Sequence, residues 1–158
     1  MADGRYLFGS VDHHRVQRAL VNRLCGVCGE ALQERLVLMM RLSDLRRKRS
    51  SEPALHPWCS AYTVRACPMI AGRQDHYRSS PQKLGPGVVP GSNSSARMGA
   101  PAEPWFTVWL TEYNVVTDHG GLAAAYDETQ LLRTRPITWS LSDGLAAIGN
   151  VLRDPDDE

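Results

Sequence analysis

The apolar residues near the start of the chain recur at helical spacing. Within residues 10–24 one helical face carries the apolar side chains Val16, Ala19, Leu20 and Leu24. The opposite face of this segment is polar, which is typical of a helix that packs on a core. Ser10 has a side-chain oxygen suited to capping the first turn. The pattern predicts a helix over residues 10–24 that leads directly into Cys25.

Shorter apolar or alternating runs predict strands further along the chain. Residues 36–40 are uninterruptedly apolar, which is typical of a buried strand. Over residues 106–111, apolar positions alternate with positions that are polar or amphipathic, as in a strand with one buried face. Residues 114–121 read as a strand that runs into a turn. Residues 131–139 are another strand candidate, and Pro136 places it at a sheet edge or a bulge.

Two further segments carry helix start and stop signals. A helix is predicted over residues 57–67, with His56 as its entry residue and a proline at its first position. Pro68 ends this helix, because proline cannot continue a helical hydrogen-bond pattern. A last helix is predicted over residues 141–152, where Ser140 provides the N-terminal cap.

The remaining segments are polar or rich in turn-forming residues. Residues 43–53 are polar and basic and are predicted to form a connecting loop. Residues 72–104 are rich in Gly, Pro and Ser without hydrophobic periodicity, which predicts a long loop or linker. We therefore interpret residues 1–158 as a single domain, with a first part over 10–71 and strands plus a terminal helix over 105–153.

Composition narrows the class of protein without indicating a function. The chain has 158 residues, of which 42% are hydrophobic and 22% charged, as in ordinary globular domains. Its net charge of +1 gives no overall field that favours nucleic acid or a membrane surface. No apolar run approaches the length of a membrane span, and the start lacks the pattern of a signal peptide. We expect a cytoplasmic protein, in which clustered cysteines are more often metal ligands than disulfides.

Two short motifs supply the residues of a candidate metal site. Cys25 and Cys28 are separated by two residues, and a glycine follows each, which permits a tight turn. Further along, His56 and Cys59 are three residues apart, so their side chains point to the same side of a helix. Zn²⁺ prefers four sulfur or nitrogen ligands in a tetrahedron. The motifs therefore predict a zinc site formed by Cys25, Cys28, His56 and Cys59.

The order of these motifs resembles that of the treble-clef zinc fingers. In that family a knuckle and a hairpin precede two ligands in the first turn of a helix, and here "CGVC" and "HPWC" match those two parts. The fuller pattern, "LCGVCG…EPALHPWCSAYTVRACP" followed by "PWFTVWL" and "RPITW", is similar to a group of small zinc-binding proteins of actinobacterial and phage genomes. The resemblance implies no activity. With the predicted elements it gives an α+β fold, in which a treble-clef-like module packs with a small antiparallel sheet and a C-terminal helix.

Alternatives to this closed zinc site remain. A pair of cysteines two residues apart also forms redox couples, but at strand-to-helix junctions, whereas this pair follows a helix. Cys67 is a second candidate for the fourth ligand. It lies eight residues after Cys59, about 12 Å along an unbroken helix, so we expect it to be a core thiol. If His56 pointed away, three cysteines and a water would leave an open, catalytic type of site.

The leading hypothesis for function is a zinc-stabilised binding module that contacts protein or nucleic acid. A short basic run is the candidate contact surface, because Lys and Arg on a finger loop commonly meet phosphates. Its residues are Arg46, Arg47, Lys48 and Arg49. Such runs are also frequent in solvated loops that bind nothing.

The alternative hypothesis is an enzyme with an opened zinc site or a pocket gated by residues 72–104. The pocket would be lined by His76, Tyr77, Asp118 and His119. A nuclease of the HNH type would need its catalytic histidine near the knuckle. The histidines of residues 12–14 and 117–121 do not stand in that position, which argues against this chemistry.

Overall fold

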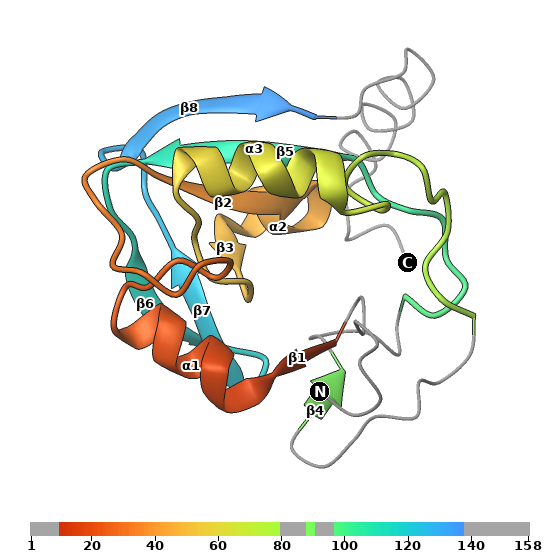
Figure 1. The fold of residues 1–158 in the computed structure, drawn as a ribbon, viewed down its shortest axis with the longest axis horizontal. Coiled ribbons are helices and arrows are strands. Elements are labelled where there is room, and N and C mark those ends of the chain that lie inside the picture. Colours follow the sequence, from red (N-terminus) through yellow and green to blue (C-terminus); the bar gives the residue numbers. More distant parts are fainter. Residues whose placement is uncertain (1–9, 80–87, 91–96, 138–158) are drawn as a thin grey trace, which may run out of the picture.

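The fold was analysed in a computed structural model, which describes residues 10–79, 88–90 and 97–137 (Figure 1). Eleven elements follow one another in these residues: β1 (Ser10–Asp12), α1 (His13–Val21), β2 (Leu36–Arg41), α2 (Leu42–Arg47), β3 (Arg49–Ser50), α3 (Pro57–Ala66), β4 (Val88–Pro90), β5 (Trp105–Leu110), β6 (Asn114–Asp118), β7 (Gly121–Ala125) and β8 (Leu131–Pro136).

The strands form three small antiparallel sheets. One has the order β2-β5-β8, a second the order β3-β7-β6, and β1 pairs with β4 in a third. Val37 of β2 lies opposite Trp109 of β5, and Trp109 in turn lies opposite Arg133 of β8. The combination of helices with antiparallel sheets confirms the predicted α+β class.

Strand β2 is buried along its whole length and separates two apolar clusters. Side chains alternate between the faces of a strand. Leu36, Leu38 and Met40 belong to a core with Leu20 of α1 and with residues of β5 and β7. Val37 and Met39 point to the other side, into a cluster that includes Cys25, Cys59 and Trp105. This two-sided burial explains why the segment is apolar at every position from 36 to 40.

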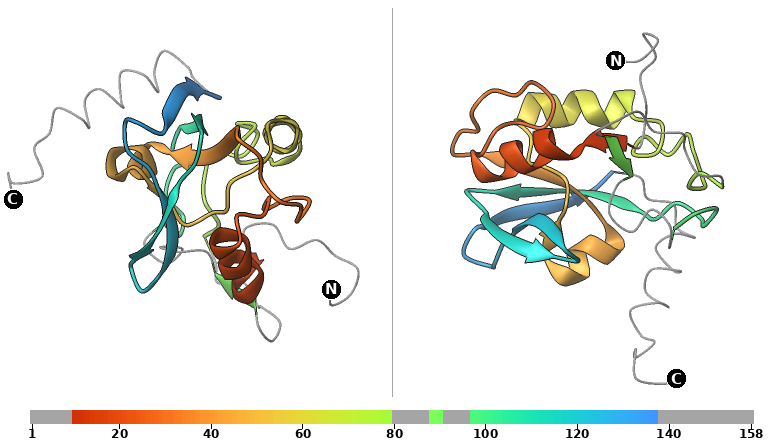
Figure 2. Two further views of the ribbon diagram at one scale, coloured as in Figure 1. Left: turned by 90° about the vertical axis from the view of Figure 1, so that its left-hand side faces the viewer. Right: turned by 90° about the horizontal axis from the view of Figure 1, so that it is seen from below.

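The helices lie on different sides of the β2-β5-β8 sheet. Helix α3 contacts β2, and α1 contacts β7 of the neighbouring sheet. The views of Figure 2 place α3 and α2 on opposite sides of the strands. The start of α3 therefore stands over the face of β2 that carries Val37 and Met39.

The first predicted helix is shorter than its apolar pattern suggested. Residues 10–12 are paired with β4, and α1 begins only at His13. Asp12, not Ser10, is the N-terminal cap, because its carboxylate accepts a hydrogen bond of 3.2 Å from the Arg15 N–H. After Val21 the chain turns and does not run directly into Cys25 as expected. An isolated bridge between Leu24 and Ala31 brackets the cysteine pair instead.

The prediction of a connecting loop over residues 43–53 was wrong, because α2 and β3 occupy most of this segment. The helix is stabilised at its start by a buried ion pair, in which Arg41 Nε lies 2.7 Å from Asp44 Oδ2. The same carboxylate accepts from the Arg41 N–H at 3.3 Å. Lys48 ends the helix in a left-handed conformation, with φ of 51°. The basic residues that suggested a loop lie in the last turn of this short helix, at its C-terminal cap and in β3.

The C-terminal strands follow the prediction in most respects. β5, β6 and β8 fall in the expected segments, and β8 is an edge strand, as Pro136 indicated. Strand β7 was missed, because "GLAAA" lacks the branched and aromatic residues that mark strands. It pairs with β6 through a tight turn at His119 and Gly120, both with positive φ.

Some predicted features fall wholly or partly outside the described residues. The helix expected over residues 141–152 and its cap Ser140 lie there. Of the segment 72–104, the described parts include β4 and an isolated bridge between His76 and Pro101. Among the helices that the structure describes, none has the length and apolar character to cross a membrane.

Candidate metal centre

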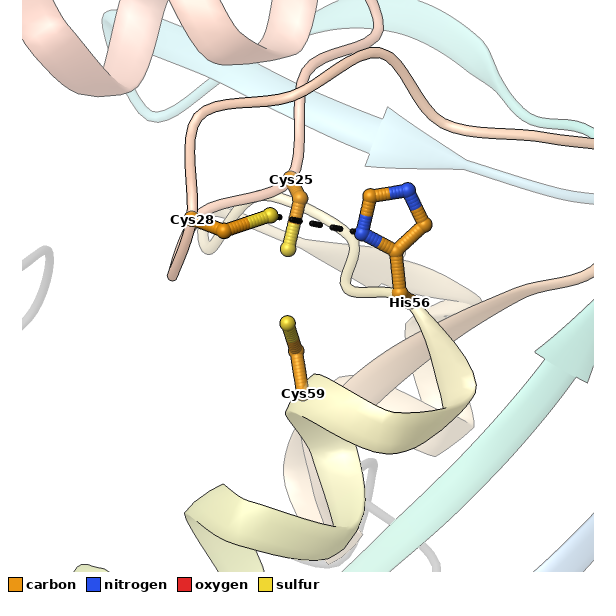
Figure 3. Close-up of side chains that lie close together, drawn as sticks. All are labelled: Cys25, Cys28, His56 and Cys59. Atoms are coloured by element: carbon orange, nitrogen blue, oxygen red, sulfur yellow. Dashed lines mark hydrogen bonds between the residues drawn. The ribbon is translucent and has the colours of Figure 1, made fainter.

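The four predicted ligands lie together at one point of the fold. The sulfur atoms of Cys25, Cys28 and Cys59 and one ring nitrogen of His56 are all within 4.8 Å of one another. Figure 3 shows their side chains converging from two segments: the cysteine pair from the turn after α1, and His56 and Cys59 from the start of α3. This cluster can hold a metal ion.

The turn that carries the cysteine pair is built by its backbone. The Cys25 N–H donates to the Glu30 carbonyl at 2.8 Å, and the Gly29 N–H donates to the Cys25 carbonyl at 2.9 Å. Gly29 has φ of +79°, a conformation that disfavours any residue with a Cβ. Gly26 is needed for a different reason, because a Cβ there would lie 3.2 Å from Pro53 Cβ. The glycines thus permit both the turn and its close approach to the segment before α3.

The other two ligands are placed by the first turn of α3. His56 is the N-cap residue, and proline follows at the first helical position, as predicted. Cys59 lies one turn further on and projects to the same side. The preceding residue, Leu55, exchanges two backbone hydrogen bonds with Val37, of 2.8 and 2.9 Å. The start of α3 is thereby tied to the buried strand β2.

A hydrogen bond on the far side of the imidazole sets its orientation. His56 Nε2 lies 2.9 Å from the Ala31 carbonyl oxygen, so Nε2 carries the proton and donates it. Nδ1 is then unprotonated and faces the cysteines, 3.4 Å from Cys28 Sγ. Metal-bound histidines commonly donate their second ring nitrogen to a carbonyl in this way. The sequence contained no signal for this contact, because Ala31 acts through its backbone.

Three of the four side chains are removed from water. Cys25, His56 and Cys59 are buried, with exposed fractions of 1%, 2% and 6%, whereas Cys28 is exposed. Because the four side chains lie close together, protein atoms surround most of the space between their ligand atoms. The centre therefore lies at the edge of the core, with one side toward solvent.

The environment favours a thiolate at Cys25 more than at Cys59. Burial raises the pKa of the Cys25 thiol. Backbone N–H groups of Val27, Cys28 and His56 donate to its sulfur and outweigh that effect, so the pKa falls to about 7. Burial, followed by the neighbouring thiols of Cys25 and Cys28, raises the pKa of Cys59 to about 12. The clustered sulfurs cannot all ionise without a cation between them.

One separation within the cluster matches the donor geometry of a tetrahedral zinc site. With Zn–S bonds of about 2.3 Å and Zn–N bonds of about 2.0 Å, sulfur and nitrogen ligands lie about 3.5 Å apart. The observed 3.4 Å between Cys28 Sγ and His56 Nδ1 agrees with that separation. Three sulfurs and one imidazole nitrogen are also a donor set that suits zinc. The residues present therefore fit the predicted metal.

Cys67 does not belong to this cluster. It is the C-terminal cap residue of α3 and is partly buried against the apolar cluster behind the site. The four grouped ligand atoms come from Cys25, Cys28, His56 and Cys59. The expectation of a core thiol at Cys67 agrees with this placement.

The basic run is largely neutralised by carboxylates. Arg47 Nη1 lies 3.0 Å from Asp118 Oδ2, and Arg49 Nη1 lies 3.7 Å from Asp118 Oδ1. Lys48 forms an ion pair with Glu128. In the part of the chain that the structure describes, Arg46 is the member of the run without an ion pair. The surface proposed for phosphate contact thus carries less free positive charge than its sequence suggests.

The residues of the alternative enzyme pocket divide between two places. Asp118 and His119 form the tip of the β6–β7 hairpin, where both contact Arg47. His76 pairs with Pro101, and Tyr77 lies under the Arg97 guanidinium. Within residues 10–79 and 97–137, no hydrogen bond or ion pair joins the two pairs.

Sequence reasoning also missed an aromatic contact at the metal centre. The Trp58 ring stacks on the His56 imidazole, with centroids 4.5 Å apart and planes inclined by 7°. Trp58 nevertheless remains 61% exposed. The position of a tryptophan two residues after a ligand was the available signal, although stacking between such neighbours does not follow from spacing.

Comparison with models of known protein families, with curated proteins and with solved structures finds no match.

Proposed function

We propose that this chain is a zinc-stabilised binding module. The observation that carries the proposal is the convergence of three thiols and the unprotonated Nδ1 of His56 on one position. Of the divalent metals, zinc is favoured by thiolate-rich tetrahedral sites. When bound, the metal supplies the positive charge that lets clustered thiolates coexist, and it joins the knuckle to α3.

The closed ligand set supports a structural role for the metal. Catalytic zinc sites use three protein ligands and leave a fourth position for water or substrate. Here His56 would occupy the fourth position, and its hydrogen bond to the Ala31 carbonyl supports this role. Activation of a zinc-bound water would require this histidine to leave, so binding is favoured over catalysis.

A treble-clef-like arrangement is part of the proposal. In support, the cysteine turn precedes a backbone pairing between Val37 and Leu55, and the remaining ligands follow at the start of α3. Helix α2 and strand β3 would then be an insertion within the hairpin. The metal would join the cysteine turn to the start of α3, and the surface above them would receive a partner.

Metal analysis of the purified protein tests the proposal. We expect one zinc per chain by mass spectrometry of the metal content. Because structural zinc contributes directly to folding, removal with a chelator should unfold the knuckle and shift the unfolding transition. Full stability after complete zinc removal would refute a stabilising role.

A further inference from the structure

The exposed face of α3 carries two aromatic rings and an arginine in one row. Trp58 and Tyr62 are 61% and 60% exposed, and they are one helical turn apart. Arg65, also exposed, follows three residues after Tyr62 on the same face. Exposed apolar side chains that adjoin one another often mark an interaction site.

The first of these rings is held in place before any partner binds. Its stacking on His56 fixes the Trp58 ring against an imidazole that is itself oriented by Ala31 and the metal position. A rigid ring loses little conformational entropy when a second ring stacks on its free face. Trp58 is therefore a preformed platform for a planar group.

Positive charge lies at the far end of this helix face. Helix α3 contains no acidic residue. The Arg73 guanidinium donates to the carbonyls of Arg65 and Ala66 at 2.8 and 3.4 Å, which brings a second cation to the end of the helix. Among the described residues, Arg35, Arg65 and Arg73 have no carboxylate in ion-pair contact. This contrasts with the basic run at residues 46–49, whose charges are mostly paired.

A surface depression beside Trp58 adds hydrogen-bonding groups. It has a volume of about 620 Å³ and is lined by Gln33, Glu34, Arg35, His56, Pro57 and Trp58. The segment from Gln33 to Arg35 also lines an adjoining depression that extends toward Arg23. Polar side chains next to a flat ring suit the edge and face of a nucleobase better than an apolar protein side chain.

We propose that the exposed face of α3 binds single-stranded nucleic acid, as a refinement of the proposed binding function. A base stacks on Trp58, Tyr62 offers a second stacking surface, and Arg65 contacts the phosphate backbone. Aromatic platforms interspersed with cations are the usual means of binding single strands without a sequence code. The basic run at residues 46–49 is not part of this surface.

The test is titration of zinc-loaded protein into fluorescein-labelled random DNA and RNA single strands, followed by fluorescence anisotropy. Strands of about 15 nucleotides cover the usual site size, and salt is varied upward from about 50 mM. We expect Trp58→Ala to raise the dissociation constant by about 5- to 150-fold, the range for loss of one stacked base. Arg65→Ala should reduce by about 0.7 the steepness with which the logarithm of the binding constant falls against the logarithm of the salt concentration. Tyr62→Ala should weaken binding independently of any effect on the metal centre.

Arg46→Ala is the matched control, because Arg46 is an exposed arginine of the basic run. It should leave both affinity and salt slope unchanged. The inference is overturned if zinc-loaded protein ignores single strands at low salt, if Trp58→Ala and Tyr62→Ala bind as tightly as the wild type, or if Arg46→Ala has the larger effect. Equal affinity for duplex DNA, or a Trp58-dependent self-association without strand binding, also contradicts it. Zinc content, measured in every sample, shows separately whether the metal proposal holds.

Discussion

His56 donates from Nε2 to the Ala31 carbonyl at 2.9 Å, and this bond turns Nδ1 toward the cysteine sulfurs. The contact joins the end of the cysteine turn to the start of α3 independently of any metal. It also selects the histidine tautomer that can bind zinc. The backbone of one segment thus prepares a ligand that belongs to another.

Replacement of His56 tests whether it is the fourth ligand. We expect His56→Ala to lower zinc affinity by at least about 100-fold, because a metal ligand and its orienting hydrogen bond are both lost. Cys67→Ser is the control, since Cys67 lies outside the cluster. Competition with a chromogenic chelator measures both affinities. Weaker zinc binding by Cys67→Ser than by His56→Ala would reverse the assignment.

Cys28→Ser separates metal binding from packing. The Cys28 side chain is exposed, so serine in its place removes no buried apolar contact. We predict that zinc binding and cooperative folding are nevertheless lost together, because structural zinc contributes its binding energy to folding. Circular dichroism and metal analysis measure the two properties. The metal-free wild type should behave in the same way, and a folded variant with a full complement of zinc would refute the ligand set.

Gly29→Ala tests the geometry of the cysteine turn. The residue has φ of +79° with open space around its Cβ position, so alanine adds backbone strain and no clash. The strain should cost about 1–2 kcal/mol of stability. Gly120→Ala, with φ of +78° in the β6–β7 turn, is the matched control for strain alone. We expect zinc affinity to fall only for Gly29→Ala, and equal zinc affinity in the two variants would show that the turn does not set the site.

Zinc affinity should rise with pH across the neutral range. Cys25 has a pKa lowered to about 7, but Cys59 has a pKa raised to about 12 and stays protonated until the metal displaces its proton. At least one proton is then released per zinc between pH 7 and 9, so the binding constant should increase at least about tenfold per pH unit.

Calorimetry in buffers of different ionisation enthalpy counts the released protons directly. A binding constant independent of pH would contradict the thiolate assignment.

The ligands could be predicted from sequence because each pair is local. The two cysteines share one turn, and His56 and Cys59 share one turn of a helix, so only the meeting of the two pairs required the fold. The preference of zinc for four ligands indicated that the two pairs meet at one ion. The partners of the ligands were not predictable in this way. The Ala31 carbonyl is a backbone group, and the stacking of Trp58 depends on the path of the chain.

The errors in the fold also have physical causes. Helix α2 begins at a buried capping pair between Arg41 and Asp44, which are three residues apart, and the basic composition of the segment concealed this local contact. Strand β7 uses Ala123 and Ala124, which are fully buried, where close packing favours small residues over strand formers. The paired charges around Asp118 likewise arise only when the β6–β7 hairpin meets α2.

X-ray absorption spectroscopy of the purified protein at the zinc edge tests the central claim most directly. The account predicts one zinc per chain with three sulfur ligands at about 2.3 Å and one nitrogen at about 2.0–2.1 Å. The nitrogen shell should disappear in His56→Ala and persist in Cys67→Ser. A shell of four sulfurs, an oxygen ligand in the wild type, or no bound metal would contradict it.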